Sequence, residues 1–134
     1  MIDFKQLMDV TINKTLLYIE DDEFSRIATI ELFEDFFKQI IVAKNGKEGL
    51  ELYNANKIDV IITDLNMPIM GGDIMVEKIR EIDKNIPILI FSAYNEEKIL
   101  NKLESFDIQG YLFKPMQFEQ ISNQLIKIFS KSNL

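Results

Sequence analysis

Carboxylate side chains directly follow two short apolar segments of this 134-residue sequence. Four consecutive acids, Glu20 to Glu23, follow one segment, and Asp64 follows another. Each group alone has an ordinary explanation, because acids are favoured in the first turn of a helix and in turns after strands. If the two groups share one cleft, however, their carboxylates repel one another unless a cation neutralises them. Ligands that offer only oxygen indicate a hard ion, Mg²⁺ or, as a substitute, Mn²⁺.

A hydroxyl and an amine follow two further apolar segments, at Ser92 and Lys114. Alone, they are explained by a helix cap and a surface salt bridge. Together with Asp64 and a cation they predict phosphoryl transfer onto a carboxylate. Asp64 would be the nucleophile, Lys114 and the cation would neutralise the phosphoryl oxygens, and Ser92 would donate a hydrogen bond to one of those oxygens.

The composition excludes several other chemistries. The chain has no histidine and no cysteine, which excludes Ser-His-Asp and Cys-His nucleophiles, imidazole or thiolate metal sites, and disulfides. A formal net charge of -7 argues against binding to nucleic acid or to anionic membranes. No signal-peptide pattern is present, and the longest apolar run, Ile86 to Phe91, is too short to cross a bilayer. We therefore expect a cytoplasmic protein that contacts neither nucleic acid nor membrane directly.

Five apolar segments of strand length alternate with helical patterns along the chain. None of the five alternates polar and apolar residues, which is typical of parallel strands covered on both faces. The expected strands are Thr15–Ile19, Ile40–Ala43, Val60–Thr63, Ile88–Phe91 and Tyr111–Phe113. The expected helices are Ser25–Phe37 (stripe Ile30, Phe33, Phe37), Lys47–Tyr53, Gly72–Ile82 (stripe Met75, Ile79, Ile82), Glu96–Ser105 and Gln117–Phe129 (stripe Phe118, Ile121, Leu125, Ile128).

This (βα)5 order predicts an α/β fold, an open doubly wound parallel sheet with right-handed crossovers. Ligands of such sheets bind beyond the carboxyl ends of the strands, where the acids, Ser92 and Lys114 lie. We expect one domain over residues 14–130, with a C-terminal tail at 131–134. The N-terminal extension, residues 1–13, carries Phe4, Leu7 and Met8 at helical spacing, which leaves a short helix and a frayed tail as alternatives.

The segments at the expected strand ends resemble the receiver domain of two-component response regulators. The resemblance covers about residues 14–130 and implies a flavodoxin-like sheet of strand order 2-1-3-4-5. It also implies a signalling domain that catalyses only its own phosphorylation and dephosphorylation, and that accepts a phosphoryl group on Asp64 from a sensor histidine kinase or phosphotransfer protein. The motifs that carry it are Leu16–Asp22, Asp64–Pro68 with Gly71–Gly72, Phe91–Ala93 and Tyr111–Pro115.

The resemblance also implies roles for individual residues. Asp21 would bind Mg²⁺ directly and Glu20 mainly through water, while Asp64 and the backbone carbonyl of Asn66 would complete the protein ligands. Asp22 falls outside this set, and we assign it to helix entry.

A switch is implied as well. The Ser92 hydroxyl would move to the phosphoryl oxygen while the Tyr111 ring turns inward, and a cis bond at Lys114–Pro115 would aim the lysine inward. Phosphorylation would then alter the surface of helix 4, strand 5 and helix 5. The partner surface would include Tyr94, Glu97, Gln109 and Tyr111.

Three positions depart from the family's commonest pattern. Ser92 replaces a more frequent threonine but keeps the hydroxyl. Gly71 stands where an acid is usual, and the Gly71-Gly72-Asp73 sequence is a turn before a helix, not a cyclase signature. Tyr94 is bulky, and with Asn66 we expect it to modulate the site and lengthen the lifetime of the phosphoryl group.

Other functions stay open at this point. A haloacid-dehalogenase-type phosphatase needs an acid two residues after the nucleophile, where this chain has Asn66. A nucleotide or flavin binder needs a glycine-rich turn in place of the acids at 20–23. A degenerate receiver would act by partner binding alone. The chain is either a single-domain regulator or a piece of a longer protein, and either a monomer or a weak dimer.

Overall fold

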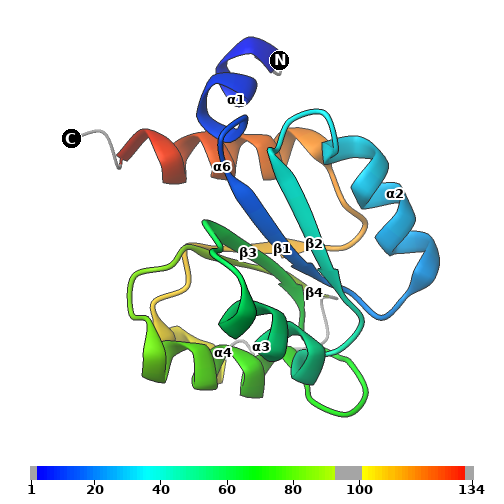
Figure 1. Cartoon of the computed structure of the whole chain (residues 1–134), viewed down its shortest axis with the longest axis vertical. Coiled ribbons are helices and arrows are strands. Elements are labelled where there is room, and N and C mark those ends of the chain that lie inside the picture. The colour runs from blue at the N-terminus through cyan, green and yellow to red at the C-terminus, as the bar shows by residue number, and fades with distance from the viewer. Residues whose placement is uncertain (1–2, 93–100, 132–134) are drawn as a thin grey trace.

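The chain folds around one five-stranded parallel sheet, as a computed structural model shows for residues 3–92 and 101–131 (Figure 1). The strand order is β2-β1-β3-β4-β5, which confirms the doubly wound 2-1-3-4-5 sheet. The strands are β1 (Thr15–Ile19), β2 (Gln39–Ala43), β3 (Val60–Asp64), β4 (Ile88–Ser92) and β5 (Gly110–Phe113). The helices are α1 (Phe4–Thr11), α2 (Glu23–Phe33), α3 (Gly46–Ala55), α4 (Gly72–Ile82), the 3-10 turn η1 (Glu104–Phe106) and α6 (Phe118–Lys131).

Helices cover both faces of the sheet, with α1, α2 and α6 on one side and α3 and α4 on the other (Figure 1). Successive side chains of the central strands point to opposite faces, and both sets are buried. Leu16 and Tyr18 of β1 contact the first helical layer, whereas Leu17 and Ile19 contact the second. This two-sided burial explains why the strands lack alternation.

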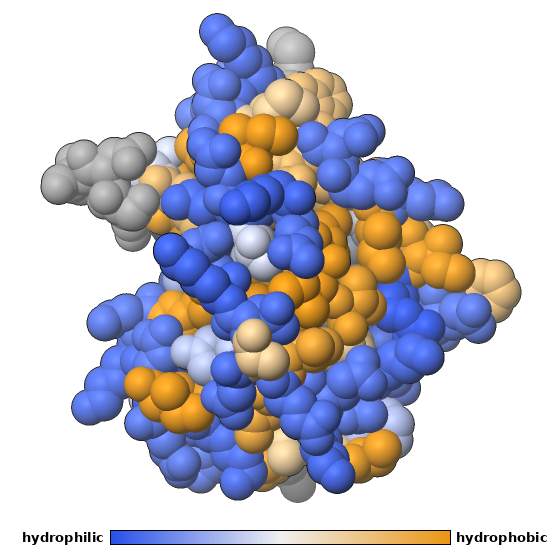
Figure 2. All heavy atoms as spheres, in the orientation of Figure 1, coloured by the Kyte–Doolittle hydropathy of each residue, from blue (hydrophilic) through white to orange (hydrophobic). Residues whose placement is uncertain are grey.

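The edge strand β2 differs from that expectation. Gln39 is exposed and Ile40, Ile41 and Val42 are only half-buried, because β2 pairs with β1 alone. Apolar side chains are accordingly visible beside β2 and over α2 in the space-filling view (Figure 2).

The apolar stripes predicted for two helices, α2 and α4, are wrong at their carboxyl-terminal residues. Helix α2 ends at Phe33, not at Phe37, because a tight turn follows and buries the Phe37 ring edge-on against Phe33. In α4, Ile82 is 62% exposed because the helix ends there, and Ile86 of the next segment is buried instead. The expected helix Glu96–Ser105 lies partly outside the described residues; 101–103 are helical and the 3-10 turn η1 follows.

Residues before β1 form a packed helix, which decides between the two alternatives for this segment. Helix α1 begins at the cap Asp3, and its Leu7 is fully buried in the core between the sheet and α6. The Phe4 ring stacks on Phe36 and Phe118, at centroid distances of 6.1 and 5.9 Å.

None of the described helices is long and apolar enough to span a membrane.

Candidate functional site

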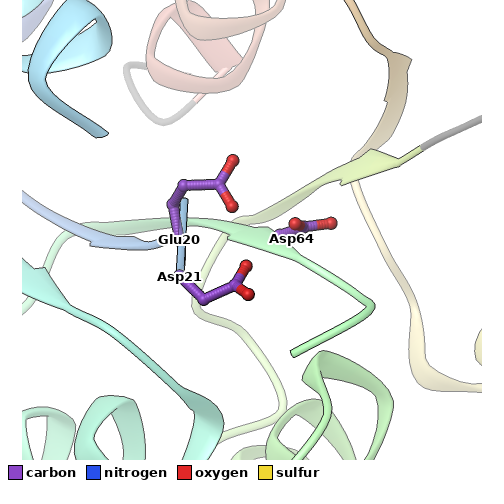
Figure 3. Close-up of side chains that lie close together, drawn as sticks. All are labelled: Glu20, Asp21 and Asp64. Carbon is purple, nitrogen blue, oxygen red and sulfur yellow. The ribbon is translucent and has the colours of Figure 1, made fainter. Parts of the chain in front are cut away.

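Three carboxylates converge at the carboxyl edge of the sheet. Strands β1 and β3 are neighbours, so Glu20 and Asp21 after β1 meet Asp64 at the end of β3 (Figure 3). Oxygens from the three side chains all lie within 4.8 Å of one another. Glu20 and Asp64 are buried, whereas Asp21 is exposed. The predicted acidic cluster is therefore present, and one of its three carboxylates, that of Asp21, faces solvent.

Lys114 reaches this cluster from β5, two strands away from β3. Its Nζ donates to Asp64 Oδ2 at 2.9 Å and to Glu20 Oε1 at 3.0 Å. The peptide bond Lys114–Pro115 is cis, as expected, and the Lys114 amide donates to the Ser92 carbonyl at the end of β4. One ammonium thus binds two of the three carboxylates directly.

The cluster carries excess negative charge. Burial and, after it, the nearby Asp64 carboxylate together raise the pKa of Glu20 to about 7, and Lys114 offsets only part of their effect. Burial alone would lower the pKa of Lys114, but its hydrogen bonds to Asp64 and Glu20 raise that pKa above its ordinary value. One ammonium does not neutralise three carboxylates, so the cluster can bind a further cation. Its ligand atoms are all oxygens, which suits Mg²⁺.

The turn that carries the first two acids is held from α2. Asp22 caps this helix, its Oδ2 accepting from the Ser25 amide at 2.9 Å, which confirms the assignment to helix entry. The Arg26 guanidinium donates through Nη1 to the carbonyls of Glu20 and Asp21, at 3.1 and 3.3 Å. Sequence reasoning missed Arg26, although its position one turn after the cap could have directed attention to it.

The loop after Asp64 is held tightly against the strand. Asp64 Oδ1 accepts from the Leu65 amide at 2.7 Å, and the Gly72 amide donates to the Leu65 carbonyl at 2.9 Å. A Cβ on Gly72 would collide with the Asp64 carbonyl, so only glycine fits at this close approach. Asn66, in the same loop, is exposed, and its predicted ligand role stays a prediction.

Ser92 ends β4 one residue beyond Phe91, the register partner of Asp64. Its side chain is 1% exposed, and its Oγ has no hydrogen-bond partner among the described residues. A buried hydroxyl without a partner is unfavourable and is expected where a ligand supplies the missing contact.

Tyr111 lies on β5 opposite Ile90, and both contact the α3–α4 side of the core. Ser92, two residues after Ile90, belongs to the same face of the sheet. Gln109, expected on the partner surface, is half-buried and accepts from the Ile88 amide at 2.7 Å; its contact with a partner stays a prediction. The predicted modulating residue Tyr94 and partner contact Glu97 lie outside the described residues.

Comparison with known proteins agrees with this geometry. Residues 16–126 match the family model described as the response regulator receiver domain. The chain is 39% identical over 94 residues to the sensor histidine kinase TmoS of Ectopseudomonas mendocina, which covers 69% of this chain but 10% of that kinase. It is 27% identical over 117 residues to the chemotaxis protein CheY of Halobacterium salinarum, covering 87% and 98% of the two chains.

Solved structures share this fold, as one example shows. It is a co-crystal structure of the Saccharomyces cerevisiae histidine phosphotransfer signalling protein Ypd1 and the receiver domain of its downstream response regulator Ssk1. The matched chain is 20% identical with a TM-score of 0.82, over 93% of this chain and 94% of that one.

Proposed function

Because the chain belongs to the response regulator receiver domain family, we propose that Asp64 is the residue on which it accepts a phosphoryl group. The chain is a receiver domain of two-component signalling. The observation that carries the residue assignment is the contact of Lys114 Nζ with Asp64 Oδ2 at 2.9 Å, inside a cluster of three carboxylates.

A carboxylate oxygen of Asp64 would attack the phosphorus of a phosphohistidine. A new P–O bond forms as the P–N bond breaks, and the leaving imidazole takes a proton from solvent. An ionised carboxylate has no proton to lose, so this reaction needs no general base, in agreement with a chain that has no histidine. Lys114 would stay beside the new acyl phosphate and neutralise one of its oxygens.

The acidic cluster would hold Mg²⁺ through Glu20, Asp21 and Asp64, with the backbone carbonyl of Asn66 as a fourth protein ligand. The bound ion would neutralise phosphoryl oxygens as charge develops on them. The exposed Asp21 would bind the ion at the mouth of the site, and the buried Glu20 would act mainly through water.

Ser92 would complete the site, because its unpartnered hydroxyl is available to donate to a phosphoryl oxygen. Its movement would make room for the Tyr111 ring on the same face of the sheet and so change the surface of β5 and its neighbouring helices. Asn66 and Tyr94 would modulate the lifetime of the phosphoryl group. The chain itself would supply the catalytic groups, Asp64, Ser92 and Lys114, for its phosphorylation and dephosphorylation.

The donor would be the phosphohistidine of a sensor histidine kinase or of a phosphotransfer protein, the partners indicated by the names of its relatives. The proposal is tested by incubating the chain with a radiolabelled phosphohistidine protein and Mg²⁺. We expect label to move to the parent chain, and to remain on the donor when Asp64 is replaced by Asn or when EDTA is added. Label that moves equally to Asp64→Asn would contradict the proposal.

A further inference from the structure

Two backbone carbonyls leave the sheet where β1 passes into α2. The Glu20 amide still donates to the Ala43 carbonyl of β2 at 3.0 Å, so the strand ladder reaches this residue. The carbonyls of Glu20 and Asp21 instead accept from one Arg26 nitrogen, at 3.1 and 3.3 Å. One side chain therefore bridges both peptide groups of the turn.

Fixing these carbonyls fixes the direction of the side chains beside them. Because the peptide bond is planar, each residue has only two flexible backbone torsions, φ and ψ. Holding the carbonyl of a residue on the side of α2 therefore restricts the direction in which the side chain of that residue can point. The carboxylates of Glu20 and Asp21 both project toward Asp64 (Figure 3). Arg26 itself is anchored at the first turn of α2, where its amide donates to the Asp22 carbonyl at 2.9 Å.

The guanidinium hydrogen-bonds to the backbone of the turn and not to the carboxylates of the cluster. In the ranges that the structure describes, the ion pairs at the site involve Lys114, and no carboxylate pairs with Arg26. Arg26 is half-buried, so solvent screens its charge in part. Two effects on a divalent ion therefore compete: the turn is held in place, and a positive charge lies nearby.

We propose that Arg26 is a positioning residue of the metal site, which holds the Glu20–Asp21 turn so that its carboxylates meet Asp64. The inference rests on the proposed Mg²⁺ site. Positioning outweighs repulsion here, because the two hydrogen bonds are direct and the charge is screened. Loss of a residue that orients metal ligands typically weakens metal binding by about tenfold or more.

Calorimetric titration of the metal-free chain with Mg²⁺ at pH 8 tests the inference, with Arg26→Met and Arg26→Lys compared against the parent. The methionine removes the charge and both hydrogen bonds, while the lysine keeps the charge and reaches one carbonyl at most. We expect both variants to bind Mg²⁺ about tenfold more weakly than the parent. Lys5→Met, which removes one exposed charge from α1, is the matched control and should bind like the parent.

A purely electrostatic role predicts the opposite order, with Arg26→Met tighter than the parent and Arg26→Lys unchanged, and that result would overturn the inference. Thermal melts of the metal-free variants show whether each variant is folded at the titration temperature. If a variant is fully folded there, a lower global stability does not change its dissociation constant for Mg²⁺. Should the methionine variant not fold, the lysine variant alone decides. A parent chain that binds no Mg²⁺ would contradict the metal site itself, an outcome distinct from equal binding by parent and variants.

Discussion

Lys114 Nζ and Asp64 Oδ2 lie 2.9 Å apart although 50 positions separate the two residues in the sequence. Strand β4 lies between their strands, so the lysine side chain passes over the end of β4 to reach the acid. The same nitrogen contacts Glu20. A single ammonium thus compensates two buried carboxylates from different strands, and the stability and chemistry of the site both depend on it.

Replacing Lys114 by Met should destabilise the metal-free chain by about 2 kcal/mol, because Glu20 and Asp64 would face each other without a cation. Urea unfolding in EDTA at pH 8 measures this. Lys102→Met is the matched control: its ion pairs with Asp73 and Glu77 are exposed, and its loss should cost below about 1 kcal/mol. Equal costs for the two variants would argue against the account.

The metal-free chain should lose stability as pH rises from about 4.5 to about 7, through the contribution of Glu20. The pKa of this carboxyl is raised from 4.5 to about 7 in the folded chain, so the folded state binds the proton more tightly than the unfolded state does. Above pH 7 Glu20→Gln should therefore melt at a higher temperature than the parent, and near pH 4 the difference should vanish. Melts in EDTA test this, with the exposed Glu51→Gln as control; a difference independent of pH would contradict it.

Ser92→Ala should slow phosphorylation by roughly tenfold or more, because a donor to the phosphoryl oxygen is lost. The stability of the unphosphorylated chain should not fall, since the hydroxyl has no partner to lose among the described residues. Ser122→Ala removes the other buried hydroxyl without a described partner, in α6, and should leave the rate unchanged. Equal rates for both variants would exclude the role of Ser92.

Leu7→Ala should destabilise the chain by about 3 kcal/mol, because the fully buried side chain would leave a cavity between α1, the sheet and α6. Phe4→Ala on the same helix should cost about 1 kcal/mol, since that ring is 55% exposed. Urea unfolding compares the two. If Leu7→Ala lowered the free energy of unfolding by less than Phe4→Ala does, α1 would contribute little to the core.

The sheet and the strand ends were predictable because their signals are local. The central strands are built on apolar runs, and the residues at or directly after the strand ends bear the chemistry. Topology alone therefore brings Glu20, Asp64 and Lys114 to one edge. Asp22 as a helix cap is equally a local signal.

Other features depend on tertiary packing that no short pattern contains. The helical stripe continues through Phe37, yet α2 ends at Phe33 because Phe36 and Phe37 pack against α6 and the core through a turn. The exposure of β2 follows from its place at the sheet edge. The two bonds from Arg26 to the preceding turn require the actual path of the backbone.

The central claim, phosphoryl acceptance by Asp64, is tested most directly by intact-mass spectrometry after incubation with acetyl phosphate and Mg²⁺. Borohydride reduction, which converts an aspartyl phosphate to homoserine, followed by peptide mapping then locates the modified residue. We predict one phosphoryl group on the parent chain and on the control Asp22→Asn, homoserine at position 64, and no addition to Asp64→Asn or in the presence of EDTA. A folded parent chain that gains no phosphoryl group from acetyl phosphate or a phosphohistidine donor, or that gains it at another residue, would contradict the account.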